Sequence, residues 1–473
     1  MTYWDLFRDD YQNFMPNTYL FYDIETSGLN KCFDQVLQFA AIRTDLDLRE
    51  VERYEIFIKL NPDVVPAPDA VLVHQLNIEQ MQSGVCEYEA MKEIHRLFNT
   101  PSTITVGYNN LGFDDEFLRF SFYRNLLAPY THQYANNCGR MDIYPMTVMY
   151  YLFKPEVIVW PKVNDAVTLK LEHLSSYNKL IDGGSHDAMN DVEATLRLAR
   201  LLKKEQAMWE YLCGYFDKKT DLTRLEKLTF IDNKYQHGLL IDGSLGGSKF
   251  YQSPVIGLGL HHHYKNQSLW LSLENNITTT ASFISRKRFG ESPILLPLTD
   301  RFSRYLNEER LEIVAANLDW LKKNPELFLE VVQYHKEYKY PEIPDLDVDA
   351  ALYQIGFTSD WERLKCNSFH AVDLPGKISL LDNFSTPNLR TQAIRVLGRN
   401  YPTVFSEKRH LYDEFTSYLK KIKLGEMMVN YKNEIRLTPQ IALAQIGNLR
   451  QTKNLSGVQD NLLIELSKYI QSW

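Results

Sequence analysis

The stretch TYLFYDIETSGLN, residues 18–30, decides the fold class and raises the question of function. It is an apolar run typical of a buried β-strand, yet it contains two acids, Asp23 and Glu25, one residue apart. Residues i and i+2 of a strand share a face, so both carboxylates are expected to point the same way. Buried carboxylates need a positive partner, and no Lys or Arg lies in the flanking strand to supply one. The pair therefore indicates a shared cation if further acids converge on it.

The composition is that of a folded protein with several domains. The chain has 473 residues, of which 44% are hydrophobic and 24% charged, with a net charge of -8. This length suggests roughly two to four domains. No run of about 18 apolar residues occurs, and residues 1–14 lack a basic start followed by an apolar core. Five widely spaced cysteines without a CxxC pair favour reduced thiols. We expect a soluble, cytoplasmic protein.

The residue patterns that indicate strands and helices change along the chain and divide it into three predicted domains. Residues 1–206 alternate strand-like and helical patterns, which is typical of an α/β layer fold. Residues 207–347 contain Gly-punctuated segments of period 2, with a hairpin expected around residues 265–267, and then helical patterns. A segment rich in prolines and acids, residues 339–350, is typical of a linker. Residues 348–473 are helical in pattern and mildly basic, with 16 Lys+Arg against 12 Asp+Glu, whereas the rest of the chain has 36 against 48.

A second acidic site is expected where a strand meets a helix in ITVGYNNLGFDDEFLRF, residues 104–120. Asn109 and Asn110 end the strand and are suited to capping. Asp114 and Asp115 fall in the first helical turn, where interaction with the helix dipole is an ordinary explanation for an acid. That explanation is expected to hold for one of the two.

A third site lies in GGSHDAMNDVEAT, residues 183–195. Asp187 is expected to cap a helix, with Asp191 one turn further on and His186 just before the cap. Taken singly, each of these residues has an ordinary structural explanation. Taken together with the pair on the strand, they predict carboxylate oxygens converging on a site for a hard cation such as Mg²⁺ or Mn²⁺.

The order of these motifs resembles that of the DEDDh 3'→5' exonuclease superfamily. The matching patterns are Asp23-x-Glu25, Asn110-x-x-Phe113-Asp114 and His186-x4-Asp191. The segments QFAAIRTD, FYRNLLAPY, LEHLSSYN, HDAMNDVEAT and ALYQIGF, together with the length and the three regions, are similar to the bacterial exonuclease I family. The resemblance implies an RNase H-like exonuclease domain, an SH3-like middle domain and an all-helical C-terminal domain.

The resemblance also implies a role for each acid at a pair of Mg²⁺ ions about 3.5 to 4 Å apart, for which Mn²⁺ can substitute. Asp23 would bridge both ions, and Glu25 and Asp191 would hold the ion on the nucleophile side. Asp114 would hold the other ion, partly through water, and is preferred to Asp115 because it directly follows Phe113 in the motif.

His186 and four substrate contacts complete the implied site. His186 would be the general base that takes a proton from the attacking water, since an unperturbed imidazole titrates near pH 6.5 and is available as a neutral base at pH 7. The terminal nucleotide would be held by Glu25, by backbone near Thr26, and by Tyr108 and Phe113. Aromatic residues at these positions could equally be core residues.

The implied function is processive 3'→5' hydrolysis of single-stranded DNA to 5'-mononucleotides by a monomer acting in DNA repair and recombination. Two alternatives stay open. One is an exonuclease for RNA ends or for a polymerase's mispaired primer, and the other is a non-catalytic scaffold that binds single-stranded DNA.

The resemblance implies a protein partner as well, the acidic C-terminal tail of the single-stranded DNA-binding protein. A tail of this kind needs an apolar pocket rimmed by Lys or Arg. The candidate surface comprises Arg390, Arg395, Arg399, Leu389, Ile394 and Leu397, although packing inside the C-terminal domain explains these residues as well. The same arginines, and SRKRF at residues 285–289, are candidate phosphate contacts.

Overall fold

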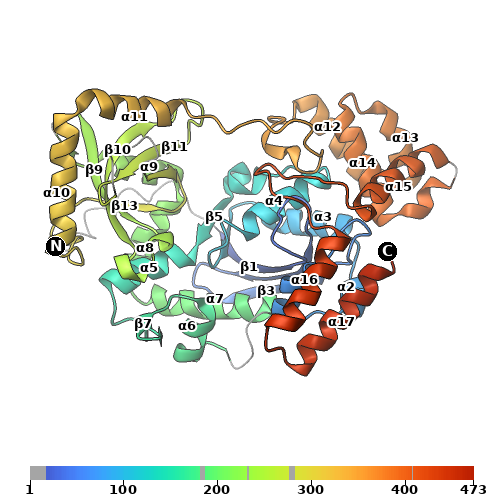
Figure 1. Cartoon of the computed structure of the whole chain (residues 1–473), viewed down its shortest axis with the longest axis horizontal. Helices are drawn as coiled ribbons and strands as arrows, with labels where there is room; N and C mark the ends of the chain where they lie inside the picture. The colour runs from blue at the N-terminus through green and yellow to red at the C-terminus, as the bar shows by residue number, and fades with distance from the viewer. Residues whose placement is uncertain (1–16, 182–186, 232–233, 276–282, 407) are drawn as a thin grey trace.

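The computed structural model describes residues 17–181, 187–231, 234–275, 283–406 and 408–473. The chain forms a central α/β body, with a second sheet and its helices on one side and a group of C-terminal helices on the other (Figure 1). This is the mixed α/β architecture that the sequence predicts. Among the helices of these described ranges, none is both long enough and apolar enough to cross a membrane.

The central body is built on a five-stranded sheet of order β3-β2-β1-β4-β5. The first three strands pair antiparallel, whereas β4 runs parallel to β1 and β5 parallel to β4. The strands are β1 (Thr18–Thr26), β2 (Val36–Thr44), β3 (Glu50–Phe57), β4 (Thr103–Gly107) and β5 (Gly139–Asp142). Because β1, β4 and β5 are parallel, their carboxyl ends meet at one edge of the sheet, where ligand sites of open α/β sheets form.

The side chains of β1 alternate between two layers of helices. Tyr22 and Ile24 are buried with residues of α3 (Glu87–Phe98) and α4 (Asp114–Arg124). Tyr19 and Phe21 are buried on the other side, with residues of α5 (Ile143–Phe153) and α7 (Ala188–Lys203). The alternation confirms that Asp23 and Glu25 share a face. The remaining helices of this body are α1 (Pro68–His74), α2 (Ile78–Ser83) and α6 (Leu171–Asn178), and the hairpin β6 (Lys162–Val163) and β7 (Ala166–Val167) precedes α6.

The second sheet has the order β12-β11-β10-β9-β13, with the short β8 paired to β9. The hairpin expected around residues 265–267 is confirmed, because the two flanking strands pair antiparallel across it. Apolar side chains of β10 and β11 pack on the long helices α10 and α11. The elements of this region are α8 (Gln206–Cys213), α9 (Lys218–Glu226), β8 (Phe230–Ile231), β9 (Tyr235–Ile241), β10 (Gln252–Leu260), β11 (Gln267–Ser272), β12 (Ile284–Arg288), β13 (Ile294–Leu296), α10 (Glu308–Lys323) and α11 (Pro325–Glu337).

The C-terminal region is helical, as predicted, but its helices form two groups. The first four pack around a core that also takes in Tyr88 of α3. The last two pack instead against α1 and α2 of the central body. These helices are α12 (Asp360–Ala371), α13 (Leu374–Leu380), α14 (Pro387–Asn400), α15 (Arg409–Lys423), α16 (Pro439–Thr452) and α17 (Gly457–Gln471).

The candidate docking surface on α14 is wrong. Leu389, Ile394 and Leu397 are buried in the helical core. The side chains of Arg395 and Arg399 are buried too, and the alternative of packing inside the domain is the one that the structure supports. Only Arg390 is partly exposed, with its Nη1 3.2 Å from Glu414. The arginines are neutralised by acids of other segments, so they cannot rim a surface pocket.

The buried arginines of α14 join three segments. Arg395 donates to Asp347 at 2.6 Å and to Asp349 at 2.9 Å, both in the predicted linker. Arg399 donates to Asp349 at 2.5 Å and to Asp63 of the central body at 2.8 Å. These pairs remove both arginines from the set of candidate phosphate contacts.

The same correction applies to Lys287 in the segment 285–289. Its Nζ lies 2.6 Å from the carboxylate of Asp221, and both side chains are fully buried. The guanidinium of Arg286 lies over the rings of Tyr338 and Tyr340, at 4.9 and 4.8 Å from their centroids. Lys287 is therefore a structural cation of the second sheet.

Candidate active site

Three of the predicted acids converge at the carboxyl end of β1. Asp23 and Glu25 of β1 and Asp191 of α7 each place one carboxylate oxygen within 4.8 Å of the others. Helix α7 crosses β1 at this point because its apolar residues, including Val192, pack in the same core as Phe21. Asp187 caps the helix, as expected, by accepting from the amides of Met189 at 3.1 Å and Asn190 at 3.3 Å.

Burial and the neighbouring carboxylates raise the pKa values of the two acids on β1. Burial raises the pKa of Asp23 well above its usual range, and the carboxylates of Asp114, Asp191 and Glu25 raise it further. Burial, with Asp191 and Asp187, raises the pKa of Glu25 to about 8. Each carboxylate thus disfavours the charge of its neighbour, which is the condition that a bound divalent cation relieves. An all-carboxylate donor set fits Mg²⁺ or Mn²⁺.

Asp114 and Asp115, adjacent in sequence, have opposite environments. Asp114 begins α4 and is buried, and burial, Asp142 and Glu25 raise its pKa, while the amides of Asp114 and Ile24 lower it. Asp115 is fully buried, yet the cations Arg140 and Arg119 outweigh burial and hold its pKa below its usual range. The structure thus places Asp114 beside the cluster and gives Asp115 cationic partners, while the role of Asp114 as a metal ligand stays a prediction.

The expected capping by Asn109 and Asn110 is not observed. The N-cap residue of α4 is Phe113, which makes no side-chain cap bond. Asn110 instead uses its Nδ2 to donate to the hydroxyl of Tyr22 at 3.1 Å. Asn110 therefore ties the end of β4 to β1.

Asp142 is a residue at this edge that the sequence reasoning missed. It is the last residue of β5, is buried, and accepts from the amides of Asn109 at 2.7 Å and Tyr144 at 2.9 Å. Burial raises its pKa to about 6. In the sequence Asp142 is an ordinary N-cap, and only the parallel pairing of β4 and β5 brings it near Asp114.

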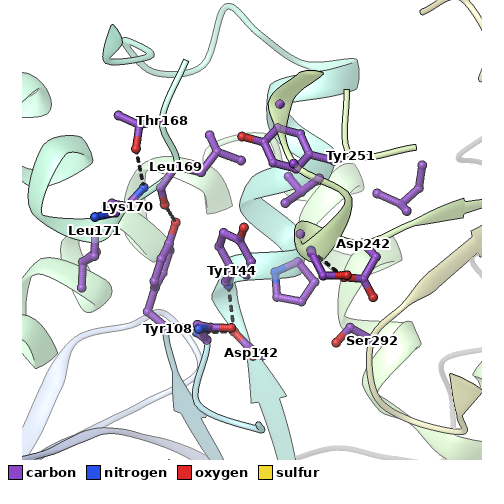
Figure 2. A pocket seen from close by; sticks show the side chains of 18 of the residues that line it. Tyr108, Asp142, Tyr144, Thr168, Leu169, Lys170, Leu171, Asp242, Tyr251 and Ser292 are labelled. Carbon is purple, nitrogen blue, oxygen red and sulfur yellow. Dashed lines mark hydrogen bonds between the residues drawn. The ribbon is translucent and has the colours of Figure 1, made fainter. Parts of the chain in front are cut away.

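A cavity of about 840 Å³ opens beside the acids, between the central body and the second sheet (Figure 2). Tyr108 and Tyr144 line it from one side, and Tyr251 lines it from the other. Tyr108 donates its hydroxyl to the carbonyl of Leu169, as the dashed line in Figure 2 shows. The charged side chains in the lining are Asp142, Lys170, Glu172, Asp191 and Asp242. With four acids and one lysine, this wall would repel a phosphate group unless cations were bound.

The other predicted contacts lie in different places. Thr26 is buried and donates from Oγ1 to the carbonyl of Gly28 at 2.8 Å. Phe113 is half-buried and packs against Phe117, with ring centroids 5.3 Å apart. Neither residue lines the cavity. His186 lies outside the described residues.

A family model, curated relatives and solved structures all show a likeness of this chain to exonucleases. A family model described as an exonuclease matches residues 20–199. Exodeoxyribonuclease I of Buchnera aphidicola subsp. Schizaphis graminum is 28% identical over 492 residues, covering 96% of this chain and 95% of the relative. Exodeoxyribonuclease I of Escherichia coli strain K12 is 28% identical over 455 residues, covering 90% of this chain and 94% of the relative.

The fold comparison extends over the whole chain. The crystal structure of E. coli exonuclease I in complex with a dA16 oligonucleotide superimposes with a TM-score of 0.84 at 25% identity, and the match covers 96% of this chain and 99% of the other. This likeness confirms the predicted fold class, an RNase H-like α/β body with an SH3-like middle region and a helical C-terminal region. In its motifs, over nearly its whole length and in its fold, the chain is thus similar to the bacterial exonuclease I family.

Proposed function

We propose that this chain is a 3'→5' exonuclease that hydrolyses single-stranded DNA to 5'-mononucleotides with the help of divalent cations. The observation that carries the proposal is the carboxylate cluster of Asp23, Glu25 and Asp191, beside Asp114 and at one end of a cavity lined with tyrosines. The family resemblance supports the same chemistry, since the chain carries the three acidic motifs and shares its fold with the E. coli relative solved with dA16.

The acids would act by holding and sharing cations. Asp23, central to the cluster, would contact both of two Mg²⁺ ions, with Glu25 and Asp191 on one ion and Asp114 on the other. When bound, such ions supply the positive charge that stabilises the transition state of phosphodiester hydrolysis. Mn²⁺, which accepts the same oxygen ligands, would substitute.

His186 would act as the general base. Asp187 follows His186 in the sequence and is the N-cap residue of α7. Two backbone amides, those of Met189 and Asn190, fix its side chain. A neutral imidazole held just before this cap could accept the proton of the attacking water, because its ordinary pKa lies close to physiological pH.

The tyrosine-lined cavity would take the 3' end of the strand. The rings of Tyr108 and Tyr144 lie edge to face with centroids 5.4 Å apart, and Tyr251 lies across the cavity from them. Base stacking on such rings contributes about 1 to 3 kcal/mol per base and tolerates any sequence. Thr26 and Phe113 remain predicted contacts of the terminal nucleotide, together with Glu25. Enclosure of the strand between the three regions would make hydrolysis processive.

The decisive experiment compares labelled substrates. Single-stranded DNA labelled at its 3' or 5' end, duplex DNA and RNA are incubated with the full chain in Mg²⁺ or EDTA. The proposal predicts early release of the 3' label from single-stranded DNA, only in Mg²⁺. Comparable rates on RNA would favour the RNA-end alternative, and binding without hydrolysis would favour the scaffold.

A variant pair locates the chemistry. Asp23→Ala removes the ligand common to both ions and is expected to reduce turnover by several orders of magnitude while binding of single-stranded DNA persists. Asp47→Ala, an exposed aspartate of the same body, is the matched control and should retain wild-type rates. Near-normal cleavage by Asp23→Ala would show that the cluster is not the catalytic site.

We also propose, from the family resemblance, that the acidic C-terminal tail of a single-stranded DNA-binding protein recruits the enzyme. The α14 surface is not its site, because the side chains of Arg395 and Arg399 are buried and paired with acids. Titration of a labelled tail peptide at low and high salt tests the partnership, since an acidic tail should bind more weakly at high salt. The monomeric state, the cytoplasmic location and the role in DNA repair and recombination remain predictions.

A further inference from the structure

The side chains of three consecutive acids at the start of α4 contact three different parts of the molecule. Asp114 faces the carboxylate cluster, Asp115 faces a pair of arginines, and Glu116 faces two tyrosines of the C-terminal region. Helix α4 therefore begins where the proposed cation site meets two accessory regions. These are the region of the second sheet and the C-terminal region.

The first set of contacts, called the Asp115 arm, runs from Asp115 through Arg140 to Glu291 in the region of the second sheet. The carboxylate of Asp115 accepts from Arg119 of α4 and from Arg140 of β5, both at 2.6 Å. Burial lowers the pKa of His132, and its Nε2 donates to the other Asp115 oxygen at 2.9 Å. These side chains are all less than one tenth exposed. Asp115 is thus held rigidly on both oxygens.

Arg140 carries the connection across to the second region. Its second amino group, Nη2, donates to Glu291 at 2.7 Å, and Glu291 follows β12. Although burial would raise the pKa of Glu291, Arg140 and the neighbouring Arg288 lower it, so the carboxylate is charged. The chain of contacts from Asp115 through Arg140 to Glu291 is charged throughout.

The second set of contacts, called the Glu116 arm, runs from Glu116 to Tyr353 and Tyr431 in the C-terminal region. One carboxylate oxygen of Glu116 accepts from the hydroxyls of Tyr353 at 2.9 Å and Tyr431 at 2.6 Å. The other oxygen is paired with Lys31, which follows β1 in the chain. The ring of Tyr431 also stacks on Phe120 of the same helix, with centroids 5.5 Å apart and planes inclined by 13°.

These two arms set the position of the first turn of α4, because its N-cap residue makes no side-chain bond. We infer that Asp115 and Glu116 are positioning residues, which place the Asp114 carboxylate in the cation site only when both accessory regions are seated on α4. The inference rests on the proposed function, since it assigns Asp114 to the cation site. Residues that orient a metal ligand from behind typically change metal affinity by about 10- to 100-fold when altered.

The test uses variants far along each arm, so that the acids of α4 stay unchanged. In the full chain, Tyr431→Phe and the double variant Tyr353→Phe/Tyr431→Phe weaken the C-terminal arm, and Glu291→Gln weakens the other. The matched controls break similar contacts elsewhere. Tyr401→Phe removes a Tyr–Glu bond of 2.7 Å between the C-terminal region and α3, and Glu274→Gln removes an Arg–Glu pair with Arg310 within the second region.

The primary measurement is Mn²⁺ binding followed by electron paramagnetic resonance, with affinity for single-stranded DNA measured in EDTA. The inference predicts that the arm variants weaken Mn²⁺ binding about tenfold or more and lower kcat, while DNA affinity stays within about twofold of wild type. The controls should bind Mn²⁺ as wild type does, even where their melting temperature falls.

Wild-type Mn²⁺ affinity in the arm variants would overturn the inference and leave the arms with a structural role only, while the loss of Mn²⁺ binding in Asp23→Ala would still support the proposed function. If Asp23→Ala binds Mn²⁺ as wild type does, the cation site itself is misassigned and both proposals fall. Equal weakening in arm variants and controls would also overturn the inference, because it would reflect general loosening.

Discussion

Replacing Arg399 by Met is expected to destabilise the native state by about 3 kcal/mol. Arg399 is buried between Asp63 and Asp349, and its Nη2 lies 2.8 and 2.5 Å from their carboxylates. Removing one partner of a buried ion pair costs about 3 to 5 kcal/mol, since the other charge is left without compensation. The lower end applies because Asp63 keeps Arg436 at 3.5 Å and Asp349 keeps Arg395 at 2.9 Å.

Urea unfolding of the full chain, followed by circular dichroism, measures this effect in the first transition that involves the C-terminal helices. Arg390→Met is the matched control on the same helix, because Arg390 pairs with Glu414 at the surface and such pairs contribute about 0 to 1 kcal/mol. A loss for Arg399→Met no larger than that for the control would refute the assignment of Arg399 as a buried strut.

The same pair predicts a pH dependence. Burial alone would raise the pKa of Asp349, but Arg399 and Arg395 lower it, and Arg399 and Arg436 likewise lower the pKa of Asp63. A carboxyl whose folded pKa is lowered contributes stability above its unfolded pKa, about 4, and loses it as the pH falls further. The difference between wild type and Arg399→Met should therefore shrink below about pH 4.

Two further predictions concern other parts of the molecule. Burial lowers the pKa of His74 to about 4, and its Nδ1 accepts from the amide of Leu76 at 2.9 Å, so the unfolded state binds the proton more readily and stability is lost as the pH falls from about 6.5 to about 4. His74→Asn keeps an acceptor for Leu76 and should remove up to about 3 kcal/mol of this acid sensitivity in urea titrations; an unchanged pH profile would contradict the assignment. Gly243→Ala would place a Cβ 2.2 Å from Cε1 of Tyr144, so the ring must move within the cavity, and KM for single-stranded DNA is expected to rise several-fold. Gly247→Ala, whose Cβ would meet its nearest atom at 3.5 Å, is the control, and equal KM values for the two variants would separate Tyr144 from substrate binding.

The sequence alone determined the features that depend on neighbours along the chain. The alternation of β1 placed Asp23 and Glu25 on one face, because the side-chain period of a strand is fixed by its backbone. Asp187 was recognisable as a cap because a capping side chain bonds to amides only two or three residues away. The hairpin between β10 and β11 followed from the same local rules.

Only the tertiary structure decided the partners of charges that lie far apart in the sequence. An arginine on an amphipathic helix has the same pattern whether it faces solvent or a buried acid, and the partner of Arg399 lies 336 residues away at Asp63. Asp142 joins the acidic edge because β5 pairs in parallel with β4. Asp114 and Asp115 are chemically identical neighbours, and the two arginines that converge on Asp115 distinguish them. Local sequence determines the secondary structure and the face on which a side chain lies. Long-range packing determines which charged groups then come into contact.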